Sequence, residues 1–306
     1  MKKIFTLLFV AVVSISMIFA AGANETAAKD EKVTVAVVIP SPLGDRSFCD
    51  SANEGVKRAN AELNAKVDLI ETQGVHEHEN AMRGAINKGY DLILGVGLDT
   101  QMMLDLANEY PDQAFASPSE LYADVLPDNL ASLLINVNKS SFLAGLIAGY
   151  MTNTDKVGVV AGGDAPGINQ FVYGFKQGVL VTNPDCKFYV NYLGFDFSNP
   201  TLGKESAIAL YDEGCDIIYS VCGLSGEGVL AAAAETGNYA VGVDTVQDEF
   251  YPGSIITSVI KRVDNSTYDL IKSYVDGNFK GGFRTLDIED GATGISWDVG
   301  YTTFKD

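Results

Sequence analysis

The residues with the clearest capacity to bind a ligand follow the ends of predicted β-strands. Asp244 comes directly after the apolar run Tyr239–Val243, and no lysine or arginine lies near it in the sequence. An ionised carboxylate can accept hydrogen bonds from two adjacent hydroxyl groups, each worth about 1.5–3 kcal/mol. Asp244 is therefore the first candidate for contact with a hydroxylated ligand.

Two phenylalanines lie in polar loops instead of apolar runs. An aromatic ring at Phe48 or Phe197 could stack on a planar or sugar-like ligand, or it could anchor its own loop. Asp50 precedes a predicted helix over residues 51–63, where it could contact a ligand or cap the helix. The sequence leaves both pairs of interpretations open.

Motifs of catalysis and metal binding are sparse. His76 and His78, flanked by glutamates, could bind a metal ion or begin a solvated helix, and no further ligand pattern accompanies them. The sequence contains no H-E-x-x-H, G-x-S-x-G or Walker P-loop motif, and the G-x-G at Gly95–Gly97 lacks a third glycine. No pair stands out among the 40 acidic residues as a catalytic pair. We expect a binding protein without metal or cofactor, and not an enzyme.

Charge and composition narrow the class further. The 306 residues include 21 Lys and Arg against 40 Asp and Glu, a net charge of −19, which disfavours nucleic acids and anionic membranes as partners. With 47% hydrophobic residues, the length suits two globular domains. Residues 215 and 222 flank one predicted strand, about 20 Å apart and beyond disulfide reach. We predict four free thiols, at Cys49, Cys186, Cys215 and Cys222.

The N-terminus is typical of an exported protein. Met1-Lys2-Lys3 precedes an uncharged stretch and the small-residue site Ala21-Gly22-Ala23, which predicts a signal peptide over residues 1–23. A retained membrane anchor is the alternative. Residues 24–31 are predicted to be a disordered lead-in. No cysteine ends the signal to accept a lipid, so we expect a soluble periplasmic or extracytoplasmic protein.

From Lys32 onward, short apolar runs alternate with helical stretches. Predicted strands cover 33–39, 67–72, 91–96, 113–116, 130–136, 156–161, 187–193, 216–221, 239–243, 255–260 and 283–288. Predicted helices cover 51–63, 80–88, 100–109, 142–151, 168–180, 203–211, 228–235 and 265–275. Runs such as Val33–Ile39 are apolar on both faces, as in a parallel sheet covered by helices. The alternation predicts an α/β fold, in which ligands bind beyond the carboxyl ends of the strands.

One loop resembles the signature of a known family. Gly44-Asp-Arg-Ser-Phe-Cys-Asp-Ser-Ala-Asn-Glu-Gly55 resembles the G-D-x-S-F-N-D-x-A-x-x-G motif of the basic membrane proteins. These are substrate-binding lipoproteins of ABC transporters and include a purine nucleoside receptor of spirochaetes. Further matches lie at 141–145, 156–158, 242–244 and 257–264, so that the resemblance covers about residues 32–290.

The resemblance implies a type I periplasmic-binding-protein fold. Two doubly wound parallel-sheet lobes would be joined by three hinge crossings, near Val137, Ile260 and Lys280, and would close over a ligand. The N-terminal lobe would comprise residues 32–136 and 260–279, and the C-terminal lobe residues 137–259 and 280–306. The protein would be a monomer, and its protein partner would be the permease of the ABC transporter.

The resemblance also implies the site. Phe48 and Phe197 would sandwich a purine, while Asp50, Asp244 and Lys261 would make polar contacts to the nucleoside. The full set of candidate ligand-binding residues is Asp45, Phe48, Cys49, Asp50, Gly97, Ser119, Phe197, Gly223, Gly226, Asp244 and Lys261.

Three positions depart from the family pattern. Cys49 replaces an asparagine that helps to recognise the base, Leu98 replaces an aromatic residue, and Ser119 lies where an acid is expected after the fourth strand. Riboflavin or a sugar therefore remains an alternative ligand. Transport and sensing through a membrane partner also remain alternatives.

Overall fold

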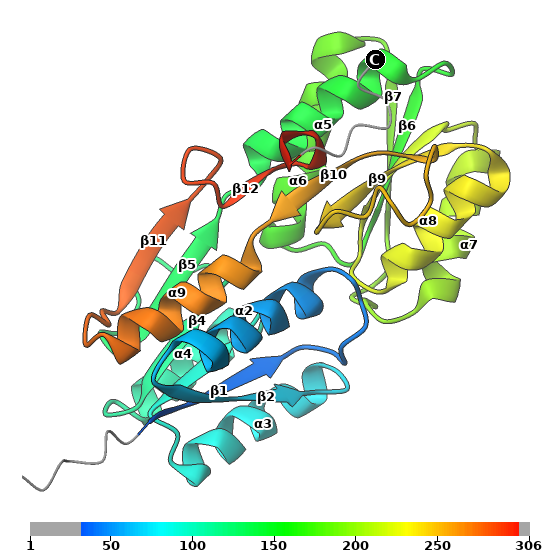
Figure 1. Ribbon diagram of the computed structural model, residues 1–306. Helices are drawn as coiled ribbons and strands as arrows, with labels where there is room; N and C mark the ends of the chain where they lie inside the picture. The colour runs from blue at the N-terminus through cyan, green and yellow to red at the C-terminus, as the bar shows by residue number, and fades with distance from the viewer. Residues whose placement is uncertain (1–31, 300–306) are drawn as a thin grey trace, which may run out of the picture. The chain divides into compact units, whose positions relative to one another are not determined.

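The computed structural model describes residues 32–299, and these form an α/β fold with two six-stranded sheets (Figure 1). The first sheet has the order β11-β5-β4-β3-β1-β2, and the second has the order β12-β10-β9-β8-β6-β7. Neighbouring strands are parallel except β12, which runs antiparallel to β10. The first sheet contains β1 (Val33–Ile39), β2 (Ala65–Glu71), β3 (Leu92–Gly95), β4 (Ala114–Ser117), β5 (Leu130–Ile135) and β11 (Gly282–Leu286). The second contains β6 (Lys156–Ala161), β7 (Lys187–Tyr192), β8 (Ile217–Val221), β9 (Tyr239–Asp244), β10 (Ile255–Lys261) and β12 (Thr293–Ile295).

Helices cover both faces of each sheet. Helices α2 (Phe48–Glu62), α3 (Val75–Lys88) and α4 (Thr100–Glu109) follow β1, β2 and β3. The remaining helices are α5 (Asn138–Met151), α6 (Pro166–Thr182), α7 (Pro200–Asp212), α8 (Ser225–Thr236), α9 (Val263–Val275) and the short 3₁₀ helix η1 (Ser296–Val299). Helix α2 packs against α9, α5 against α6, and α7 against α8.

The apolar run of β1 explains why helices cover both faces of its sheet. Val35, Val37 and Ile39 pack with residues of α2 and α9, whereas Ala36 and Val38 pack with residues of α3 and α4. Successive side chains of a strand point to opposite faces, so a strand buried on both faces must be apolar throughout.

The second sheet is covered in the same way. Val157 and Val159 of β6 pack with residues of α5 and α6, while Val160 packs with residues of α7 and α8. Helices α5 and α6 approach closely at Gly145, where a Cβ atom would lie 2.1 Å from the carbonyl oxygen of Phe175. Only glycine permits that contact.

The structure confirms the predicted fold class and corrects some boundaries. Strand β12 is missing from the prediction, and helices α2, α3 and α5 each begin three to five residues earlier than predicted. Strand β11 pairs with β5 in the first sheet, although residues 280–306 were assigned to the C-terminal lobe. The third passage between the sheets therefore follows Leu286 and does not lie near Lys280.

Several sequence predictions concern residues outside the described range. The predicted signal peptide, the lead-in and residues 300–306 fall there. Within residues 32–299, no helix is both long and apolar enough to cross a membrane. The four cysteines are free, as predicted, and all four are buried.

Candidate functional site

The loop after β1 is held to the start of α2 by two aspartates. Asp45 is buried, and its carboxylate accepts hydrogen bonds from the backbone N–H groups of Ser47, Cys49 and Asp50. Burial raises the pKa of Asp45, and these hydrogen bonds oppose the rise. Asp50 lies in the first turn of α2 and accepts from the N–H groups of Gly44 and Arg46. The capping interpretation of Asp50 is therefore wrong, because its carboxylate binds the preceding loop and not the first turn of the helix.

Two of the departures from the family pattern are buried in the core. Cys49 packs among the residues beneath α2, with its Sγ 3.3 Å from Ser41 Oγ, and burial raises the pKa of its thiol. Leu98 packs on the other face of the sheet, among residues of α3 and α4. Both side chains thus contribute to the hydrophobic core.

Phe48 is half-buried against the loop that follows β3. A Cβ atom at Gly97 would lie 2.7 Å from Phe48 Cε1, so only glycine allows the ring to approach this loop. Gly97 has φ +62°, and its N–H donates to Ser119 Oγ at 3.0 Å. Ser119 is fully buried, and this hydrogen bond joins the loop after β4 to the loop after β3.

The residue that supplies the acid after β4 is Glu120, which the sequence analysis did not single out. Its Oε1 lies 2.5 Å from Lys261 Nζ, and the two side chains are 9% and 4% exposed. Lys261 Nζ also lies 5.3 Å from the ring centroid of Phe48 and 5.6 Å from that of Phe171, within cation–π range. This buried ion pair joins the carboxyl ends of β4 and β10, and removing one partner of such a pair costs about 3–5 kcal/mol.

Asp244 ends β9 in a strained conformation. Its φ is +67°, and the N–H of Thr245 donates to the carbonyl of Val243, as in a γ-turn. A non-glycine residue in the left-handed region costs about 1–3 kcal/mol and is found preferentially at functional sites. Burial raises the pKa of Asp244 to about 6, while the charge of Lys261 and a hydrogen bond from Ser47 act against the rise.

Phe197 lies in the loop after β7 and contacts two glycine-containing loops. A Cβ atom at Gly162 would lie 2.0 Å from Phe197 Cε1, and one at Gly223 would lie 3.2 Å from its carbonyl oxygen. Gly226, another candidate ligand-binding residue, is buried in α8, where a Cβ atom would lie 2.4 Å from Ser220 Oγ.

Ser47 also belongs to this group, although the sequence analysis did not select it. Its Oγ donates to Asp244 Oδ2 at 2.5 Å, across 197 positions of sequence. The structure thus brings Phe48, Lys261 and Asp244 together with Ser47 and Glu120. Among the other candidates, Asp45, Asp50 and Ser119 take part in hydrogen bonds within or between the loops that carry Ser47, Phe48 and Glu120.

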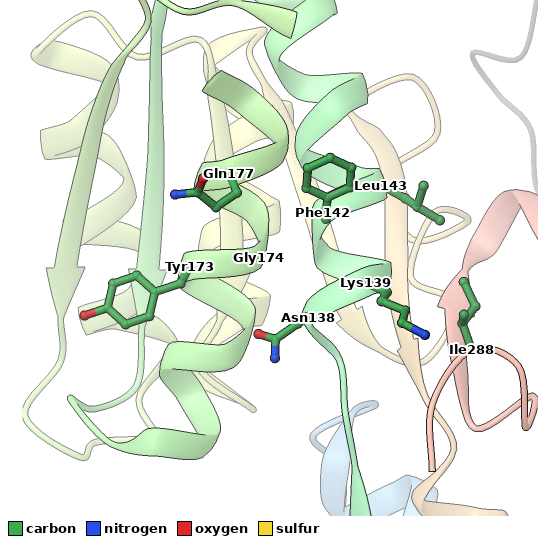
Figure 2. Close-up of a pocket in the computed structure, with 8 residues that line it drawn as sticks. All are labelled: Asn138, Lys139, Phe142, Leu143, Tyr173, Gly174, Gln177 and Ile288. Atoms are coloured by element: carbon green, nitrogen blue, oxygen red, sulfur yellow. The ribbon is translucent and has the colours of Figure 1, made fainter. Parts of the chain in front are cut away.

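Two open grooves lie elsewhere, along α5 and α6. The first, of about 560 Å³, has a mostly apolar surface, to which Phe142, Leu143 and Ile288 contribute (Figure 2). The second, of about 570 Å³, lies at the start of α6 and shares Asn138 and Tyr173 with the first. None of the candidate ligand-binding residues lines either groove.

The two histidines do not lie in a metal site. Both are in the first turn of α3, where His78 is buried with its Nε2 3.2 Å from the carbonyl of Pro40, and burial lowers its pKa. His76 is exposed beside Glu77. Within residues 32–299, no group of three or more His, Cys, Asp or Glu side chains is placed to hold a metal ion.

Comparison with known proteins identifies the family. The model of the Bmp family, described as "ABC transporter substrate-binding protein PnrA-like", matches residues 32–303. The chain belongs to the Bmp family. Proteins of this family are substrate-binding components of ABC transporters and not a class of enzyme.

Individual relatives agree with this assignment. Basic membrane protein D of Borreliella burgdorferi is 29% identical over 263 residues, which cover 84% of this Bmp-family chain and 76% of the relative. An uncharacterized lipoprotein of Pyrococcus abyssi is 31% identical over 294 residues, covering 91% and 72%. The crystal structure of an ABC transporter solute-binding protein from Aeropyrum pernix K1 superposes with a TM-score of 0.81 at 31% identity, covering 89% of this chain and 83% of that one.

Proposed function

We propose that this Bmp-family protein captures a purine nucleoside, or a similar planar hydroxylated solute, and delivers it to an ABC transporter permease. The proposal depends above all on Asp244, a buried carboxylate on a strained turn at the carboxyl end of β9. Ser47 donates to one of its oxygens, and within residues 32–299 no hydrogen bond is found to the other. A ribose hydroxyl would satisfy that oxygen, which is the role expected for this residue from the sequence.

The aromatic residues support a planar ligand. Phe48 and Phe197 each lie against a glycine at the carboxyl end of a strand, Gly97 after β3 and Gly162 after β6. We propose that a base stacks on these rings, with each stacking contact worth about 1–3 kcal/mol.

The pair Glu120 and Lys261 would complete the recognition of the ligand. Together they offer a hydrogen-bond acceptor and a donor from opposite sheets, close to the ring of Phe48. Their separation on ligand binding would be costly, so we propose that the ligand contacts the pair while it remains intact.

Capture requires that the two sheets, each with its helices, act as lobes. We propose that they close around the ligand by a hinge at the three chain passages, after β5, after β10 and after β11. Export, directed by the predicted signal peptide, would place the protein where it can meet its solute.

The identity of the ligand is tested by isothermal titration calorimetry on the purified, refolded protein. Refolding removes any retained solute, whose mass is determined separately after denaturation. Adenosine, guanosine and inosine should bind, and the matching free bases and ribose should bind at least tenfold more weakly. Binding of riboflavin or a sugar in preference to every nucleoside would contradict the proposal.

The role of Asp244 is tested with the same ligands. Asp244→Asn should weaken nucleoside binding about 30-fold or more, as loss of a charged hydrogen bond of about 2–3 kcal/mol implies. Its affinity for the free base should change little. Asp216→Asn is the matched control, because Asp216 is buried near the other end of the sheet and accepts from Thr152 and Asn153. An equal loss for nucleoside and base would show that Asp244 does not contact the sugar.

A further inference from the structure

Two consecutive residues after β1 contact two consecutive residues at the end of β9. Ser47 Oγ donates to Asp244 Oδ2 at 2.5 Å, and Thr245 Oγ1 donates to the carbonyl of Arg46 at 2.6 Å. Gln247 Nε2 donates to the same carbonyl at 3.3 Å. We refer to Arg46–Ser47 together with Asp244–Thr245 as the clasp.

The backbone of the clasp is strained on both sides. Arg46 has φ +47° and Asp244 has φ +67°, values that residues other than glycine seldom adopt. Such conformations persist only where surrounding contacts impose them. Hydrogen bonds between the two loops are contacts of this kind, and they link Asp244 to a residue 197 positions away in the sequence.

We propose that Ser47 is a positioning residue for the Asp244 carboxylate, holding one oxygen so that the other is aimed at the ligand. The binding group would then be complete in the arrangement that the structure shows, in which the loops after β1 and β9 meet directly. The ligand part of this inference depends on the proposed function, whereas the positioning of the carboxylate does not.

The electrostatic surroundings make this role measurable. Lys261 favours the ionised carboxylate, while Asp45 and Glu120 disfavour it, and burial has the largest effect. A hydroxyl that donates to a carboxylate lowers its pKa, because it stabilises the charged form. Loss of the Ser47 hydroxyl should therefore raise the pKa of Asp244 above its value of about 6. The ionisable side chains that face Asp244 are Lys261, Asp45, Glu120 and the deeply buried Tyr219.

The first experiment uses the ligand-free protein. Aspartate labelled with ¹³C at Cγ is titrated by NMR, and the Asp244 signal is assigned by its loss in Asp244→Asn. Ser47→Ala should raise the pKa of Asp244 by about one pH unit, as loss of a hydrogen bond to a charged group implies. Ser47→Thr, which keeps the hydroxyl, should restore the wild-type value.

A matched control and a second variant at Ser47 complete the NMR experiment. Ser51→Ala is the matched control, because Ser51 is a buried serine of α2 whose Oγ accepts from the N–H of Asp264 and not from the clasp. Its Asp244 titration should match that of the wild type. Ser47→Cys keeps the size of the side chain but has a weaker hydrogen-bond donor, so it should raise the pKa of Asp244 by a smaller amount. It also provides a second test if Ser47→Ala does not fold. An unchanged Asp244 pKa in both Ser47→Ala and Ser47→Cys would overturn the proposal.

A second experiment measures adenosine affinity from pH 6.5 to 8.5. The loss of affinity in Ser47→Ala should grow as the pH falls, since the raised pKa neutralises Asp244 sooner. A loss of equal size at every pH would show a merely structural serine and would overturn the proposal. If no nucleoside binds even the wild type, the proposed ligand is wrong, and the NMR titration still decides whether Ser47 positions Asp244.

Discussion

Asp244→Asn should stabilise the ligand-free protein while it weakens binding. The pKa of Asp244 rises from 3.8 to about 6 on folding, mainly because the carboxyl group is buried. At about 1.4 kcal/mol per pH unit, this rise means that the ionised carboxylate costs about 3 kcal/mol at neutral pH. Asparagine keeps an oxygen for Ser47 and removes the charge.

The sign of the pH dependence follows from the direction of the shift. A carboxyl group whose pKa is raised in the folded state binds more protons when folded, so its contribution to stability falls as the pH rises from about 4 to 6. Above that range the whole cost is present. The stabilisation by Asp244→Asn should therefore be largest near pH 7.5 and should vanish near pH 4.

The measurement is urea unfolding at several pH values on protein freed of ligand. After allowance for the imperfect fit of the amide, we expect about 1–3 kcal/mol of stabilisation at pH 7.5, or roughly 2–8 °C in Tm. Asp216→Asn should instead destabilise the protein, because its carboxylate accepts two hydrogen bonds of 2.6 Å. If Asp244→Asn is less stable than the wild type at pH 7.5, the carboxylate is satisfied within the ligand-free protein and the reasoning fails.

Two further predictions concern the residues around Asp244. Phe197→Ala should weaken nucleoside binding about tenfold or more, because a stacking contact is lost. The Tm of the ligand-free protein should be nearly unchanged, because the ring is only half-buried. Calorimetry measures the first effect and thermal melting the second. Lys261→Met should destabilise the protein by about 3–5 kcal/mol, because Glu120 stays buried without its partner. Adding Glu120→Gln should recover part of that loss, as measured by urea unfolding in a double-mutant cycle. Additive effects of the two substitutions would mean that the ion pair contributes nothing to stability.

Much of the fold follows from local apolar patterns. The run Val33–Ile39 is apolar on both faces, and the structure places β1 at those residues. Strand β12 escaped prediction because three residues are too few to show a period, and it pairs at the edge of its sheet. Helices α3 and α5 begin with polar turns and have no side-chain cap, so their first residues gave no start signal.

The candidate site was less predictable, because its contacts join distant parts of the chain. Asp244 was recognisable from its position after a buried strand, and the structure places its carboxylate in a buried polar cluster. Glu120 differs by one position from the expected acid, and only its pairing with Lys261, 141 positions away, singles it out. Asp45 lies two positions before Ser47, the N-cap of α2, so the usual capping position did not mark it, although its carboxylate accepts from the N–H groups of Cys49 and Asp50 in the first turn.

The polar groups of the cluster are partnered across the two sheets and not within one. Lys261 and Asp244 come from β10 and β9, whereas Glu120 and Ser47, their partners, come from loops of the first sheet. Buried charges that lose such partners carry a large desolvation cost unless water reaches them. Opening between the sheets would therefore have to admit water to all four side chains at once. Closure would then depend on the ligand mainly through the second oxygen of Asp244 and the rings of Phe48 and Phe197. Substitutions at these residues should therefore lower ligand affinity without an equal loss of stability in the ligand-free protein.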